Sequence, residues 1–146
     1  MVHVGETRLE TKGFGDFHDI TESVRQAVAD SGVGNGIACV ANPGSTAGIT
    51  TIEYEDGALA DLARALEVIA PQEGSYRHDA RWHDGNGFAH LRSALVGTSR
   101  SFPVVDGTLE LGTWQQVLFI DFDNRPRRRS IRIVAVSYTH LRAHET

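Results

Sequence analysis

Three of the seven histidines in this 146-residue chain lie in one short segment, together with two aspartates. These residues are His78, Asp79, His83, Asp84 and His90. Imidazole is a good zinc ligand, and catalytic zinc sites use three protein ligands and one open position. The three histidines are therefore candidate ligands of a divalent metal, zinc in the first place. Asp79 and Asp84 are candidate catalytic residues that orient the imidazoles or act as general bases.

The spacing of these histidines matches no sharp metal-binding motif such as His-Glu-x-x-His. On spacing alone, they could equally be histidines of a surface loop that hydrogen-bond to neighbouring aspartates without any function. The residue types indicate a metal site, and the spacing leaves both readings open.

Groups that could bind a phosphate lie on both sides of this segment. Arg92 offers paired donors, so it is a candidate for phosphate binding and catalysis, although an ordinary exposed arginine is the alternative. Ser45 and Thr46 follow Gly44 in a loop that could present backbone N–H and hydroxyl donors to an anion. A plain loop is the competing interpretation. If the functional readings hold, the ligand is a small phosphorylated metabolite.

Two further features have a structural and a functional reading. Trp114 and Gln115 could stack on a substrate ring or hydrogen-bond to it, but a half-buried tryptophan in the core explains the pattern as well. The basic run from Arg125 to Arg129 could grip phosphate or an acidic neighbour. We favour a solvated connection between two strands for this run.

The elements that must position these residues follow from hydrophobic periodicity and from turn residues. Apolar spacing and stop signals predict helices at residues 22–31, 58–70 and 89–96. Residues 72–87 are polar and rich in Gly, His and Asp, and we expect a long ordered loop there. Asp106-Gly107 predicts a tight hairpin. Strands are expected at residues 2–11, 36–40, 47–54, 102–105, 108–111, 117–122 and 130–136.

Strands precede, separate and follow the helices without regular βαβ alternation, which favours an α+β fold. We expect a mostly antiparallel β-sheet sandwich with two to three helices in one domain, residues 1–136. The last ten residues do not continue the strand pattern. We expect residues 137–146 to be a non-native or disordered tail, and we exclude His140 and His144 from the site.

Composition narrows the class of protein. The formal net charge of -5 argues against a general nucleic-acid binder, which needs excess Lys and Arg. No apolar run is long enough to span a bilayer, and the N-terminus lacks signal-peptide features, so we expect a cytoplasmic protein without membrane contact. The single cysteine, Cys39, is expected to be a packed thiol.

Six segments, taken in order, resemble the YjbQ family over about residues 5 to 136. They are Asp19-Ile20-Thr21, Gly44-Ser45-Thr46-Ala47-Gly48-Ile49-Thr50, Tyr76-Arg77-His78-Asp79, Ala89-His90-Leu91-Arg92, Asp106-Gly107-Thr108-Leu109 and Leu111-Gly112-Thr113-Trp114-Gln115. The resemblance implies a compact α+β fold, a homotrimer and a metal site made of histidines. It also implies secondary thiamine-phosphate synthase activity, which joins hydroxymethylpyrimidine diphosphate to thiazole phosphate and releases diphosphate.

The resemblance makes His78 and His90 the first candidates for metal ligands. At Gly44 the chain departs from the family pattern, because many relatives have His-Thr-Thr or His-Thr-Ser there. We hypothesise that His83 restores a set of three histidines. Two alternatives to the transferase remain: a non-catalytic trimeric protein that binds a metal or ligand, and a metal-dependent hydrolase of a phosphorylated metabolite.

Overall fold

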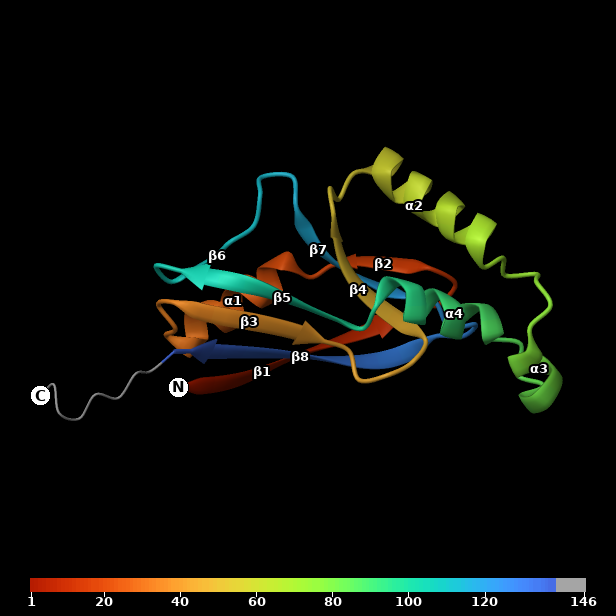
Figure 1. Ribbon diagram of the computed structural model, residues 1–146, viewed down its shortest axis with the longest axis horizontal. Helices are drawn as coiled ribbons and strands as arrows, with labels where there is room; N and C mark the ends of the chain where they lie inside the picture. Colours follow the sequence, from red (N-terminus) through yellow and green to blue (C-terminus); the bar gives the residue numbers. More distant parts are fainter. Residues whose placement is uncertain (139–146) are drawn as a thin grey trace, which may run out of the picture.

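The computed structural model describes residues 1–138, which form two antiparallel sheets and four helices (Figure 1). The strands are β1 (Val2–Thr11), β2 (Asp16–Asp19), β3 (Gly36–Ala41), β4 (Ala47–Ile52), β5 (Ser99–Val105), β6 (Thr108–Leu109), β7 (Gln116–Asp121) and β8 (Arg127–Ser137). The helices are α1 (Thr21–Ser31), α2 (Asp56–Ile69), α3 (Arg77–Trp82) and α4 (Gly87–Val96). The larger sheet has the order β1-β8-β3-β5-β6, and the smaller one β2-β7-β4. This confirms the predicted α+β class with antiparallel sheets.

Strand β7 is buried on both faces and joins the two hydrophobic cores. Val117 and Phe119 belong to the core between the two sheets and α1. Leu118 and Ile120 alternate with them and belong to the second core, which α2 and α4 help to form on the other face of the small sheet. A strand buried on both faces needs a continuous apolar run, which is the pattern of this segment.

Helix α1 ends where glycine can adopt a left-handed backbone. Gly32 has φ 70° and donates its N–H to the carbonyl of Ala29. The predicted hairpin is also present, because Val105 pairs with Thr108 across Asp106 and Gly107. Both turn residues have positive φ, as a two-residue hairpin of this kind requires.

The main local difference from the sequence prediction concerns residues 72–87. This segment contains the short helix α3, which was expected to be loop, so residues 1–138 hold four helices instead of two to three. The two-residue strand β6 is shorter than predicted, and β2 was not predicted. Within residues 1–138, no helix is long and apolar enough to cross a membrane.

The boundary expected near Val136 lies close to the end of β8 at Ser137, which pairs with Gly36. Residues 139–146, with His140 and His144, lie outside the described part of the chain, so the prediction of a tail stays a prediction.

Candidate functional site

Helix α3 and the turn after it bring an imidazole and two carboxylates together. Nδ1 of His78 lies 3.2 Å from Oδ1 of Asp79 and 3.2 Å from Oδ1 of Asp84. His83 makes this possible, because its backbone has φ 58° and its N–H bonds to the carbonyl of Asp79, ending the helix. The chain then turns back, and Asp84 faces the ring of His78.

We call His78, Asp79 and Asp84 the acid–histidine cluster. One ligand atom from each of the three residues lies within 4.8 Å of the other two. Carboxylate oxygen and imidazole nitrogen together suit a divalent cation such as zinc. The donor set therefore fits the metal that the sequence predicts, although it differs from three histidines.

The other two predicted ligands are placed differently. The ring of His90, from α4, stacks near that of His78, with centroids 4.4 Å apart and an interplanar angle of 38°. His83 is exposed and does not belong to the group of three potential ligands. The structure therefore brings His78 and His90 together, and it gives His83 a turn position beside the cluster.

The acid–histidine cluster is anchored to the rest of the fold at two points. Oδ1 of Asp79 accepts the N–H of Gly87 at 2.8 Å, which fixes α3 against the start of α4. The side-chain amide of Asn124 donates to the carbonyl of Asp84 at 2.7 Å. Because Asn124 lies in the short connection from β7 to β8, the cluster is tied to the sheet that forms the second core.

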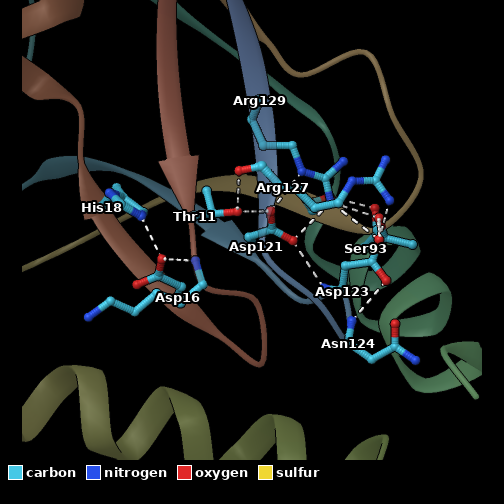
Figure 2. A network of polar contacts seen from close by, with 12 residues as sticks. Thr11, Asp16, His18, Ser93, Asp121, Asp123, Asn124, Arg127 and Arg129 are labelled. Atoms are coloured by element: carbon cyan, nitrogen blue, oxygen red, sulfur yellow. Dashed lines mark hydrogen bonds and ion pairs between the residues drawn. The ribbon is translucent and has the colours of Figure 1, made fainter.

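A buried network of charged residues lies next to these anchors (Figure 2). Asp121 is 0% exposed and accepts Nε of Arg129 at 2.7 Å and Nη2 at 2.8 Å. The hydroxyl of Thr11 donates to the same carboxylate at 2.6 Å, and the N–H of Asp123 donates at 3.0 Å. Burial alone raises the pKa of Asp121, but these hydrogen bonds outweigh it and the pKa lies below the ordinary value.

Asp123 connects this network to the loop before α4 and to the loop before β4. Its Oδ1 accepts the side-chain amide of Asn86 at 3.1 Å, and its Oδ2 accepts Nη1 of Arg127 at 2.7 Å. The hydroxyl of Thr46 donates to Oδ2 at 3.2 Å. Burial raises the pKa of Asp123, but the hydrogen bonds from Asn86, Asn124 and Thr46 outweigh it, so the pKa is lowered overall.

The predicted phosphate-binding residues do not share one environment. The hydroxyl of Thr46 already donates one hydrogen bond and accepts another: it donates to Asp123 and accepts from Nη2 of Arg129 at 2.8 Å. Ser45 is exposed beside it. Arg92 is buried, donating Nε to the carbonyl of Ala70 at 2.9 Å and Nη2 to Glu67 at 2.7 Å.

Arg92 also points away from the histidines. Two residues along an α-helix correspond to about 200° around its axis, so Arg92 and His90 lie on opposite sides of α4. The guanidinium lies over the ring of Phe88, 5.2 Å from its centroid. In this chain Arg92 ties α4 to the end of α2, and it does not reach the acid–histidine cluster.

Trp114 and Gln115 lie in the loop between β6 and β7, at a distance from α3 along the long axis of the molecule (Figure 1). Trp114 is 73% exposed, so it does not pack in the core of this chain. Gln115 accepts the N–H of Gly112 at 3.0 Å and donates to the hydroxyl of Thr51 at 3.3 Å. The chain alone does not bring these two residues to the acid–histidine cluster.

The sequence interpretation missed the buried network. The basic run was expected to be a solvated connection, and for Arg129 that is wrong, because its side chain is 6% exposed. The signal was period-two alternation, since Arg129, Ile131, Ile133 and Ala135 occupy one face of β8 and are all buried.

The comparisons with known proteins agree with this architecture. The family model described as "UPF0047 protein YjbQ-like" matches residues 5–138. A UPF0047 protein of Methanothermobacter thermautotrophicus is 39% identical over 132 residues, covering 90% of each chain. A UPF0047 protein of Archaeoglobus fulgidus is 36% identical and is matched over 99% of its length and 90% of this chain.

Solved structures show the same fold. A YbjQ-like protein of unknown function from Sulfolobus solfataricus superposes with a TM-score of 0.89 at 31% identity, over 94% of this chain and 98% of its own. An uncharacterised YjbQ/UPF0047 protein from Clostridium acetobutylicum gives a TM-score of 0.83 at 36% identity, over 90% of this chain and 99% of its own. From the family model and these relatives, the chain belongs to the YjbQ-like UPF0047 family.

Proposed function

We propose that this protein is a metal-assisted transferase acting on phosphorylated metabolites, with the acid–histidine cluster as its metal site. The observation that carries the proposal is the convergence of His78, Asp79 and Asp84 within 4.8 Å. Two carboxylates facing one imidazole create a concentration of negative charge that a divalent cation would neutralise. When bound, such a metal supplies a positive charge that stabilises a departing diphosphate.

The residues around the metal position have separate tasks in this proposal. His78, Asp79 and Asp84 hold the cation, and His90 stands beside them as a further nitrogen donor or proton carrier. The Gly87 N–H fixes one oxygen of Asp79, which limits how far this carboxylate can move. Arg92 acts as a positioning residue, because it fixes α4, and with it His90, against the end of α2.

The reaction we propose is that of a secondary thiamine-phosphate synthase. Hydroxymethylpyrimidine diphosphate is joined to thiazole phosphate, and diphosphate leaves. This assignment rests on the resemblance to the YjbQ family, with the metal cluster as its physical support. The cytoplasm, where such phosphorylated metabolites occur, is the proposed location.

We also propose assembly as a homotrimer. Several large apolar side chains are exposed on this chain, among them Val68 at 77%, Ile69 at 60% and Trp114 at 73%. Exposed apolar surface of this kind is typical of contacts between chains. In such a trimer, Trp114 of one subunit would contribute to a site on a neighbouring subunit.

Diphosphate release from the two named substrates tests this function. Zinc-loaded protein should release diphosphate only when both substrates are present. His78→Ala should lower the rate by about a hundredfold or more, because even the loss of a group that merely orients a metal ligand costs about 10–100-fold. Arg81→Ala is the control, because it changes an exposed residue of the same helix. Release from the pyrimidine substrate alone would indicate hydrolysis and would refute the transferase.

A further inference from the structure

Strand β1 forms the outer border of the larger sheet, with β8 as its neighbour on one side (Figure 1). The N–H of Ser137 in β8 donates to the carbonyl of Met1, just before β1, at 3.0 Å. Hydrogen-bonded and non-bonded pairs alternate in an antiparallel ladder, so the odd-numbered residues of β1 bond to β8. The even-numbered residues therefore turn their backbone N–H and C=O groups outward. Within residues 1–138, no second strand pairs with these groups.

A groove of about 410 Å³ lies beside this edge, between β1 and helix α1. The lining from β1 includes His3 and Thr7, and the lining from α1 includes Glu22 and Asp30. Four residues of a strand and eight residues of a helix both span about 12–13 Å. The groove is therefore as long as about four residues of an extended chain.

The charge of the groove is negative. Its lining contains Glu6, Glu22 and Asp30, and no lysine or arginine. Glu6 is already held in ion pairs. Glu22 forms an exposed ion pair with Arg25, and a pair of this kind contributes little and exchanges readily. Asp30 accepts the neutral amide of Gln26 at 2.8 Å, and no ion pair within residues 1–138 balances its charge.

An extended segment with basic side chains matches both properties of this edge. Its backbone would pair with the outward groups of β1, and every second side chain would point into the groove below α1. Lysine or arginine at these positions would meet Glu22 and Asp30. A second copy of β1 would not, because its residues on this face include His3, Gly5 and Thr7 but no lysine or arginine.

We propose that the free edge of β1 and the groove beside α1 bind an extended basic segment of another protein, which adds a strand to the larger sheet. This interaction goes beyond the proposed function. The groove shares no residue with the acid–histidine cluster, so the two sites can be tested separately.

Hydrogen exchange of the backbone amides, followed by NMR, tests this proposal. The probe is a capped peptide of about seven residues, in which lysine alternates with valine, long enough to form one strand. The amides of Val4, Glu6 and Arg8 should exchange rapidly in the free protein and at least about tenfold more slowly with saturating peptide. The amides of Gly5 and Thr7 already bond to β8 and serve as the internal reference.

A pair of double variants separates the groove from general attraction by a negatively charged protein. Glu22→Gln with Asp30→Asn should weaken peptide binding by about fivefold or more, the combined effect of two exposed ion pairs. Glu53→Gln with Asp61→Asn is the matched control, because it removes the same charge at exposed positions outside the groove.

Two control peptides separate charge from strand pairing. A peptide with glutamate in place of lysine should not bind. A lysine peptide that is methylated at alternate backbone nitrogens keeps its charge, but it cannot donate to the edge of β1, so it should bind more weakly and leave the exchange unchanged.

The proposal is wrong if the lysine peptide does not slow exchange at Val4, Glu6 and Arg8, or if the methylated peptide binds as tightly as the parent. Equal binding to the two double variants would also overturn it. Slow exchange at these amides without peptide would show that the edge is already paired with another copy of the chain, and this result would overturn it too.

Discussion

Replacing Asp121 with asparagine should destabilise the protein by about 3–5 kcal/mol, the usual cost of leaving a buried ion pair without one partner. Asp121 is 0% exposed and the side chain of Arg129 is 6% exposed, so water cannot replace the lost carboxylate. Asparagine also brings an amide donor into a site where Thr11, Arg129 and the Asp123 N–H already donate. Domains of this kind have total stabilities of about 5–15 kcal/mol, so the loss is large but measurable.

Urea-induced unfolding, followed by circular dichroism, measures this change. Asp61→Asn is the control, because Asp61 is 73% exposed and its nearest ion-pair contact, Arg64, lies at 3.4 Å on the helix surface. A surface pair of this kind contributes about 0–1 kcal/mol. We therefore expect the urea midpoint to fall strongly for Asp121→Asn and hardly at all for Asp61→Asn.

Combining Asp121→Asn with Arg129→Met examines the reason for the loss. The double variant should be more stable than the sum of the two single changes predicts, since no buried charge is left unpaired. A loss below about 1 kcal/mol for Asp121→Asn, within the range of surface pairs, would refute the reasoning. Strict additivity in the double variant would refute it as well.

The same carboxylate predicts a pH dependence. The folded pKa of Asp121 lies below the unfolded value of 3.8, because the hydrogen bonds from Arg129 and Thr11 favour the ionised form despite burial. A lowered folded pKa contributes stability that is complete above the unfolded pKa and is lost as pH falls through the folded one. The free energy of unfolding of the wild type should therefore fall steeply below about pH 4. Asp123, whose pKa is also lowered, adds to this pH dependence. In Asp121→Asn the free energy of unfolding should fall less steeply with decreasing pH.

Three further substitutions have defined outcomes. Leu118→Ala, in the second core, should cost about 2–5 kcal/mol in urea unfolding, whereas Leu95→Ala, 57% exposed on α4, should cost well under 1 kcal/mol; equal losses would contradict the described core. Arg92→Met should lower the melting temperature but leave the metal content unchanged, and loss of metal by elemental analysis would contradict its positioning role. Gly107→Ala, at φ 76°, should cost about 1 kcal/mol in urea unfolding, and Gly34→Ala close to nothing; a neutral Gly107→Ala would argue against a left-handed backbone at this turn.

Much of the fold could be predicted because local patterns specify it. The apolar run of β7, the alternation in β1 and the hairpin at Asp106-Gly107 each need only neighbouring residues to be recognised. Strand β2 was missed because its four residues, Asp16–Asp19, carry little apolar pattern and pair with β7 from far along the chain. Helix α3 was missed for a similar reason, since none of its residues is buried.

The candidate site was predicted in part. Residue types brought His78, Asp79, Asp84 and His90 into consideration, and these residues lie together. That a left-handed turn at His83 returns Asp84 to His78 could not be predicted from spacing, because it depends on one backbone angle. Likewise, sequence could not show that Glu67 and Ala70 accept the hydrogen bonds of Arg92, because both lie more than twenty residues away along the chain.

The most direct test of the account is the zinc content of purified, untagged protein, measured by elemental analysis in the wild type, in Asp84→Asn and in His83→Ala. We predict near-stoichiometric zinc in the wild type, strong loss in Asp84→Asn and retention in His83→Ala, because Asp84 belongs to the acid–histidine cluster and His83 does not. Zinc that is lost in His83→Ala but kept in Asp84→Asn would restore a three-histidine site. A folded wild type without metal, which also binds none when zinc is added, would contradict the central claim.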